Sequence, residues 1–220
     1  MSHKTPSGLF VLALALTAAR LSAQTITSQL GVAGGVAIPT GAYHSGSLGG
    51  FKPGWQTMGL VAFKPDALPV SVRVDVTYGV NDADDQFKAI YQSSTGRPVD
   101  AKSKLLGVNV DLTYPLPIPS RLHPYVLAGL GTYHATISMT EGQAGSTSSA
   151  DTSETTLSWN LGAGISVGGG SVAAVFFEAR YVHVAGGLGY SCPLPTSCPR
   201  QFGPASTFIP VTAGIRFGGR

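Results

Sequence analysis

The chain has few charged residues, and this scarcity is its most informative compositional feature. Asp, Glu, Lys and Arg make up 11% of the 220 residues, about half of the share that is usual in soluble domains. Glycine is abundant, at 29 residues, and the mean hydropathy is +0.20. No apolar run reaches the roughly 20 residues that a transmembrane helix needs. This composition fits a protein that crosses a membrane with strands better than it fits a soluble enzyme.

One short apolar run, Leu9–Ala19, follows a basic start and ends in small residues. We therefore expect a secretory signal peptide over residues 1–23, cleaved after Ala23; a buried N-terminal helix is the alternative. Cleavage would remove two of the 14 basic residues and none of the 11 acidic ones, which lowers the net charge from +3 to +1. A nearly neutral mature chain without a basic cluster argues against a nucleic-acid partner.

The chain has only two cysteines, Cys192 and Cys198, which lie on either side of the sequence PLPTS. Because export leads to an oxidising compartment, we expect these two residues to form a local disulfide. The loop that it would close is small, so its stabilisation would be modest. A metal site is the alternative, but no third or fourth ligand clusters nearby. We expect no metal and no cofactor.

What the chain has in quantity is strict alternation of apolar and polar residues. In Val70–Val80 every second residue is large and apolar, while Arg73 and Asp75 lie on the opposite face. A period of two predicts a strand. Seven further segments share this strand character: Leu30–Ile38, Trp55–Lys64, Lys104–Tyr114, Pro124–Ile137, Thr156–Val167, Val172–Val182 and Thr207–Phe217. Most have the length that a tilted strand needs to cross a membrane.

The connections between these strands alternate between short and long. Short connections follow the second, fourth and sixth strands, and the four long, polar ones are Pro39–Gly54, Asn81–Ser103, Ser138–Thr155 and His183–Ser206. Short turns on one side and long loops on the other are typical of outer-membrane barrels. We expect an all-β, eight-stranded antiparallel up-and-down transmembrane β-barrel over residues 24–220, with its long loops outside the cell. The loop Ser138–Thr155 is low in complexity, and we expect it to be flexible.

Three segments carry a resemblance to a known family: the glycine-rich first strand GVAGGVAIPTG, the strand HPYVLAGLGTYH and the closing PVTAGIRF. They resemble the small outer-membrane β-barrel proteins of the OmpA/OmpX type. The resemblance implies localisation in the cell outer membrane of a Gram-negative-type envelope. It also implies outer-membrane lipid, lipopolysaccharide and the barrel-assembly machinery as partners.

The sharpest candidate site is a set of charged residues that alternation places inside the barrel. It comprises three basic and three acidic residues: Arg73, Asp75, Asp111, Glu178, Arg180 and Arg216. If the third and fourth strands pair across their connection, Arg73 lies near Asp111. The set could gate a narrow, porin-like pore or plug the lumen. An eight-stranded barrel is only about wide enough for side chains, and this favours the plug.

Aromatic residues near the strand ends predict two girdles at the membrane interfaces. The outer girdle would hold Trp55, Tyr78, Trp159 and Tyr181, and the periplasmic girdle Phe63, Tyr114, Tyr125 and Phe217. The faces on which Trp55 and Tyr125 lie are ambiguous from the sequence. The alternative is that aromatic residues are simply common in strands.

Nothing in the sequence predicts an enzyme. The histidines of the mature chain are His44, His123, His134 and His183, and none has a serine and an acid at useful spacing. We therefore expect a structural or cell-surface interaction role, with a possible extracellular ligand bound through the long loops. The alternatives are a narrow channel and a soluble lipocalin-like barrel that binds an apolar ligand. The lipocalin-like barrel would need the apolar faces inside and the charges outside.

Overall fold

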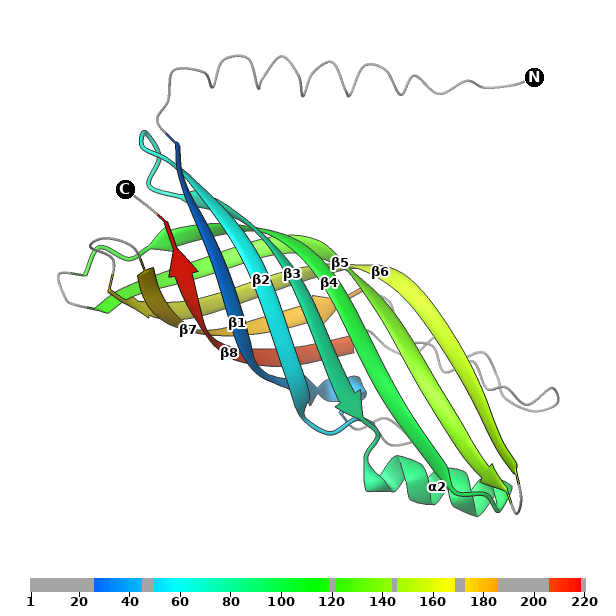
Figure 1. Cartoon of the computed structure of the whole chain (residues 1–220). Coiled ribbons are helices and arrows are strands. Elements are labelled where there is room, and N and C mark those ends of the chain that lie inside the picture. The colour runs from blue at the N-terminus through cyan, green and yellow to red at the C-terminus, as the bar shows by residue number, and fades with distance from the viewer. Residues whose placement is uncertain are drawn as a thin grey trace, which may run out of the picture.

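The chain forms a closed eight-stranded barrel in which every strand pairs antiparallel with its neighbours in sequence (Figure 1). The structure is a computed structural model that describes residues 26–44, 50–118, 122–143, 146–168, 173–185 and 206–218. The predicted signal peptide and the predicted disulfide partners, Cys192 and Cys198, lie outside these residues. The strands are β1 (Ile26–Thr40), β2 (Gly54–Pro65), β3 (Ser71–Asp82), β4 (Val99–Pro115), β5 (Leu122–Gln143), β6 (Ser146–Val167), β7 (Ala173–Val184) and β8 (Ser206–Phe217).

The barrel closes where β1 pairs with β8, from Leu30 opposite Phe217 to Thr40 opposite Thr207. Because the strand number is even, β1 begins and β8 ends at the same end of the barrel (Figure 1). The short β2–β3, β4–β5 and β6–β7 connections lie at this end too. In outer-membrane barrels the end with short turns is periplasmic, so we call the other end the outer end. The predicted eight-stranded antiparallel barrel is confirmed.

Alternation sorts the side chains onto two faces of the barrel wall. Along β3 the side chains of Val72, Val76 and Tyr78 are exposed on the outside, whereas Arg73 and Asp75 are buried inside. The outer wall is apolar on all eight strands, with side chains such as Leu30, Leu112 and Leu161 more than half exposed. This arrangement is the reverse of the lipocalin-like alternative, which required charges outside. An apolar outer wall is what a barrel needs in lipid.

The outer loops differ from the sequence prediction in two places. Most of the expected flexible loop Ser138–Thr155 instead continues β5, which ends at Gln143, and β6, which begins at Ser146 opposite it. Serine and threonine are rich in this segment, and threonine fits a pleated strand well. The hairpin extends past the other strands at the outer end (Figure 1).

The second difference lies in the expected loop Asn81–Ser103, which holds a helix, α2 (Asp85–Thr95), between longer strands. The Asp84 side chain caps the helix by accepting a hydrogen bond from the Phe87 backbone N–H, and Gly96 ends it with a φ of 70°. An acidic N-cap and a left-handed glycine are recognised helix signals. The alternation typical of strands carries no sign of a helix, so the sequence prediction lacked it.

The interior of the barrel has a mainly polar half and a mainly apolar half. The apolar half lies at the outer end, where η1 (Gly41–Tyr43), Phe51 and the helix residue Phe87 pack onto inward-facing strand residues. The members of this apolar cluster include Tyr43, Phe51, Ala83, Phe87, Val99, Ala101, Leu105, Tyr133, Ala135, Ile137, Val182, Val184 and Phe208. The sequence predicted a polar lumen, and this cluster corrects that prediction for the outer half. Among the described residues, no helix is long and apolar enough to span a bilayer.

Candidate functional site: a charged cluster across the lumen

The candidate site is a group of five charged side chains in the polar half of the lumen, contributed by three strands. Arg73 and Asp75 come from β3, Asp111 from β4, and Glu178 and Arg180 from β7. Each of the five residues is at most 6% exposed. In a ring of eight strands, β3 and β7 are four strands apart in either direction and so face each other. Ion pairs between them cross the whole interior.

Arg73 makes one of the contacts that cross the interior. Its Nη1 lies 2.7 Å from Glu178 Oε2 and its Nη2 lies 3.3 Å from Glu178 Oε1, which is a two-contact pair. Its Nε lies 3.3 Å from Asp75 Oδ2 on its own strand. A bidentate guanidinium–carboxylate pair fixes geometry as well as charge. The predicted neighbours Arg73 and Asp111 are directly opposite in the β3–β4 register, but the ion pair of Asp111 is made with Arg180.

Arg180 contacts all three acidic residues. Its Nε lies 2.6 Å from Glu178 Oε1, its Nη1 lies 3.0 Å from Asp111 Oδ2 and its Nη2 lies 2.8 Å from Asp75 Oδ2. It is the hub of the cluster, because removing it would leave three buried carboxylates with only Arg73 beside them. Isolated buried charges are very costly, whereas paired and hydrogen-bonded ones are tolerated.

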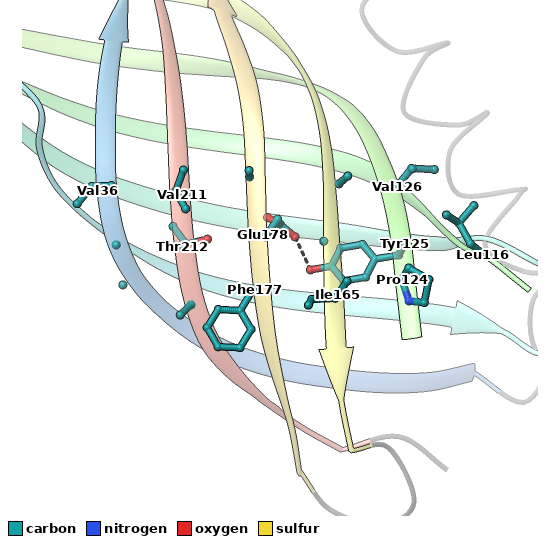
Figure 2. A pocket seen from close by; sticks show the side chains of 16 residues that line it. Val36, Leu116, Pro124, Tyr125, Val126, Ile165, Phe177, Glu178, Val211 and Thr212 are labelled. Atoms are coloured by element: carbon teal, nitrogen blue, oxygen red, sulfur yellow. Dashed lines mark hydrogen bonds between the residues drawn. The ribbon is translucent and has the colours of Figure 1, made fainter. Parts of the chain in front are cut away.

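Neutral groups complete the hydrogen bonding of the carboxylates. The Nδ2 atoms of Asn109 and Asn160 donate to Asp75 Oδ1 at 3.0 Å and to Asp111 Oδ1 at 2.9 Å. The hydroxyl of Tyr125 donates to Glu178 Oε2 at 2.8 Å (Figure 2). The Met58 sulfur accepts from Arg73 Nη2 at 3.0 Å. Sequence reasoning did not assign these four residues to the site, although Asn109 and Asn160 share the inward parity of the charged set.

Arg216, the sixth residue of the predicted set, also points inward but joins the cluster differently. Its guanidinium carbon lies 5.4 Å from the ring centroid of Tyr125 and 5.4 Å from that of Phe176. Among the described residues, no carboxylate lies within ion-pair distance of it. It is held by aromatic faces rather than by charge.

Glycines directly opposite on the neighbouring strands leave room for these side chains. A Cβ atom on Gly164 would collide with the ring of Tyr125, and one on Gly129 would collide with the carboxylate of Asp111. Glycine in a strand interior often marks such a close approach. The glycine-rich composition of β5 and β6 is therefore part of the site.

The predicted aromatic girdles are placed as expected except at one residue. Trp55, Tyr78, Trp159 and Tyr181 are exposed on the outer wall toward the outer end, and Phe63, Tyr114 and Phe217 toward the periplasmic end. Tyr125 is the exception: it is 4% exposed and points into the lumen. Parity explains this, because residues with odd numbers on β5 face inward from Tyr125 to Ile137.

A depression of about 600 Å³ lies next to the site, near Tyr125 and Glu178 (Figure 2). Most of its lining is apolar and belongs to the outer wall, including the exposed residues Val36, Phe177 and Val211. It therefore opens toward the lipid-facing side rather than into the lumen.

The histidines are scattered over the described part of the barrel. His44 follows η1, and His123 lies at the start of β5. His134 Nδ1 lies 2.8 Å from Thr155 Oγ1 on the outer wall, and His183 stacks on Trp159. No group of three or more metal-ligating side chains occurs among the described residues.

Comparison with known proteins agrees with this architecture. The structure is similar to that of a major outer membrane protein from Thermus thermophilus, with a TM-score of 0.58 and 12% identity over 89% of this chain and 100% of that chain. It is also similar to Neisserial surface protein A, with a TM-score of 0.46 and 16% identity over 88% and 97% of the two chains. At 12% identity the likeness to the Thermus thermophilus protein concerns the fold alone. No curated protein matches the chain.

A family model matches the sequence directly. The model described as the outer membrane protein beta-barrel domain matches residues 9–193, which is most of the chain. The matched region includes β1 to β7, and so covers all five residues of the charged cluster. An apolar outer wall, a closed barrel and this match agree with one another, and family membership implies residence in an outer membrane. The chain belongs to the outer membrane protein beta-barrel domain family.

Proposed function

We propose that this barrel is closed to solutes and acts through its outer end, as a structural or surface-interaction protein without catalysis. The observation that carries the proposal is the Arg73–Glu178 ion pair, which joins opposite walls of the barrel. An eight-stranded barrel has an interior about as wide as its side chains. A pair that crosses it occupies the space that a pore would need.

The burial of the cluster supports closure. Luminal side chains beside a water-filled channel would be exposed to water, yet Asp75, Asp111 and Arg73 are between 0% and 2% exposed. The apolar cluster at the outer end adds a second layer, since Phe51, Phe87 and Phe208 are buried above the charges. A narrow channel would have to pass both layers.

The construction of the outer end supports a surface role. Two ion pairs hold α2 to the barrel, Lys52–Asp85 at 2.8 Å and Lys88–Asp100 at 2.8 Å, and Arg97, just after the helix, pairs with Glu141 at 3.4 Å. The Tyr91 hydroxyl also donates to Glu141. These contacts fix the helix against β4 and β5 before a partner binds, and preorganisation favours binding. Exposed loops carry function more often than scaffolds do.

The partners that we propose follow from the location. They are outer-membrane lipid, lipopolysaccharide and the barrel-assembly machinery, together with an extracellular ligand that contacts the outer end. Export would require the signal peptide over residues 1–23, and the oxidising periplasm would favour the Cys192–Cys198 disulfide. Mass spectrometry of the membrane-extracted chain tests both: we expect an N-terminus at Gln24 and no free thiol without reductant.

Conductance in planar bilayers tests the closed lumen. We expect purified wild-type barrel, shown to be folded by its heat-modifiable gel mobility, to give no discrete current steps above the protein-free background. Stepwise currents from the folded protein, with a size that depends on the salt concentration, would contradict closure and favour the narrow channel. A large porin reconstituted under the same conditions provides the positive control.

A further inference from the structure

The outer part of β6 is paired with a neighbouring strand on one side only. On the β5 side, β6 is paired along its whole length, up to Ser146 opposite Gln143. On the β7 side the pairing ends at Ser158 opposite Val184, and no other described strand pairs with β6 beyond it. Figure 1 shows the hairpin of β5 and β6 projecting at the outer end, with β6 along its border. We call the segment Ser146–Thr156 the β6 edge.

The direction of the backbone groups follows from one hydrogen bond. Alternate residues of an antiparallel strand direct their N–H and C=O groups to opposite neighbours. The Leu157 C=O accepts from the Ala185 N–H on the β7 side, so the odd-numbered residues of β6 face that side. The register with β5 has no bulge, so this alternation holds along the β6 edge. The backbone groups that no described strand meets are those of Thr147, Ser149, Asp151, Ser153 and Thr155.

The β6 edge begins beyond the outer aromatic girdle. Trp159 is the girdle residue of β6, and there the strand is still paired on both sides, with Leu130 and His183. A backbone group without a partner is very costly in hydrocarbon. Pairing on both sides up to Ser158 and on one side farther out therefore matches the boundary of the membrane. The β6 edge lies outside the hydrocarbon, where a protein partner can reach it.

The β6 edge lacks the features that protect natural sheet edges from pairing. Protected edges are short, carry Lys or Pro, or are twisted away by a bulge. The β6 edge, STSSADTSETT, contains neither Lys nor Pro, and its pairing with β5 is regular. Threonine also favours the extended conformation. Such an edge accepts an extended peptide as an added strand.

The charge of the β6 edge indicates which kind of peptide it accepts. Asp151 and Glu154 are its charged residues, and neither forms an ion pair with a described residue. Neither β5 nor β6 contains a Lys or an Arg. Because like charges on adjacent strands are destabilising, a second copy of this acidic edge is a poor partner. Opposite charges on adjacent strands are stabilising, so a basic strand fits.

We propose that the β6 edge binds an extended, basic segment of an extracellular protein, which joins the sheet as an additional antiparallel strand. Backbone hydrogen bonds to the odd-numbered residues hold the segment, whatever its sequence. Selectivity comes from a Lys or Arg opposite Asp151 and a second one opposite Glu154, three positions apart. This inference names the partner of the surface-interaction role proposed above, and it rests on that role.

Peptide binding to the wild-type barrel tests the proposal without any substitution in the protein. The probe is a fluorescent peptide of threonine and valine with two lysines three positions apart. Its binding to the folded barrel in nanodiscs is followed by fluorescence anisotropy. We expect saturable binding, and at least tenfold weaker binding when both lysines are replaced by glutamate.

Methylation of the peptide backbone separates strand pairing from simple charge attraction. In an antiparallel added strand, the lysine nearer the C-terminus lies opposite Asp151, so its own N–H faces the β6 edge. N-methylation of that lysine and of every second residue from it should weaken binding at least tenfold. N-methylation of the other alternate set, which faces solvent, should change binding by less than about twofold.

Substitutions in the β6 edge test the protein side. Ser153→Pro removes an N–H on the open side but none that bonds β5, and we expect at least tenfold weaker binding. Ser153→Ala is the matched control and should bind as the wild type does. Asp151→Asn should weaken binding about two- to fivefold, whereas Asp66→Asn, in the β2–β3 connection at the periplasmic end, should have no effect. Heat-modifiable gel mobility checks that each variant is folded.

Several outcomes would overturn the inference. One is the absence of saturable binding to the wild-type barrel, which is also the result expected if another segment of this chain covers the β6 edge. Others are equal binding of the two methylated peptides, or of the lysine and glutamate peptides. A dimer in native mass spectrometry that Ser153→Pro dissociates would assign the edge to a second copy instead. Conductance of the same samples tests the closed lumen separately, so a barrel that neither conducts nor binds the peptide contradicts this inference alone.

Discussion

Arg73 and Glu178 lie on opposite walls of the barrel and form an ion pair with contacts of 2.7 and 3.3 Å. The two residues are 105 positions apart in sequence, so no local pattern connects them. This ion pair joins β3 and β7 directly across the lumen, rather than through the strands that lie between them in the sheet. The energetic consequences can be measured by substitution.

Loss of the hub residue should be the most damaging change. We expect Arg180→Met to lower the free energy of unfolding by about 3–5 kcal/mol, because it leaves Asp75, Asp111 and Glu178 with one guanidinium among them. Urea titration of the barrel in detergent, followed by gel mobility, measures this change. Arg216→Met is the control and should cost about 0.5–2 kcal/mol, since it removes ring contacts only. Equal losses would show that Arg180 is not the hub.

The crossing pair should show strong energetic coupling. A double-mutant cycle with Arg73→Met and Glu178→Gln should give a coupling energy of about 1–3 kcal/mol, because each single variant leaves a buried partner without its counter-charge. The exposed pair Lys88–Asp100 should give a much smaller value by the same denaturation assay, because exposed ion pairs contribute little. A crossing pair with no more coupling than the exposed one would refute the assigned contact.

Glycine substitution tests the close packing around the tyrosine of the site. Gly164→Ala places a Cβ against the Tyr125 ring and 2.7 Å from a backbone oxygen of Phe177. We expect a loss of about 1–3 kcal/mol from overpacking. Gly59→Ala is the matched control, since its Cβ would have nothing within 4 Å, and the change should stay within about 0.5 kcal/mol. Unfolding titrations of both variants decide between these expectations.

Acid should loosen the attachment of α2. Lys88 donates a hydrogen bond to Asp100, and this contact lowers the pKa of the Asp100 carboxyl below 3.8. Because the folded pKa is lower than the unfolded one, the pair adds stability above pH 3.8 that is lost as the pH falls through the folded value. The same contact raises the pKa of Lys88, so at the alkaline end its contribution persists up to the unfolded pKa of 10.5 and is lost as the pH rises through the folded value.

Two other groups around α2 have shifted pKa values. Lys52 lowers the pKa of Asp85 through a hydrogen bond. Burial, with Glu141 nearby, raises the pKa of Tyr91 to about 12, so its hydroxyl remains a donor throughout. A spin label on Gln92→Cys, in a background with Cys192 and Cys198 replaced by serine, should gain mobility between about pH 7 and about pH 3. Asp100→Asn should increase the mobility already at neutral pH. Identical spectra at both pH values would contradict the attachment.

Much of the scaffold could be predicted from the sequence, because alternate residues along a strand point to opposite faces of the barrel wall. A period of two assigns Val72, Val76 and Tyr78 to one face and Arg73 and Asp75 to the other, independently of what lies opposite. The helix α2 and the long β5–β6 hairpin were missed. Strand alternation carries no information about a helix, and a Ser/Thr-rich segment looks like a loop until its pairing partner is known. The inward face of Tyr125 was undecided because glycines at 129 and 131 interrupt the pattern on β5.

The sequence by itself determined which charged residues face the lumen and that their charges balance, because facing is a local property of a strand. Only the tertiary structure decided which carboxylate each arginine contacts: Asp111 lies opposite Arg73 in the register, yet its ion pair is with Arg180. Barrel closure brings β7 against β3 across the interior, and no strand pairing specifies that approach. Partner choice therefore depends on the diameter of the closed barrel and on the glycines that leave room inside it.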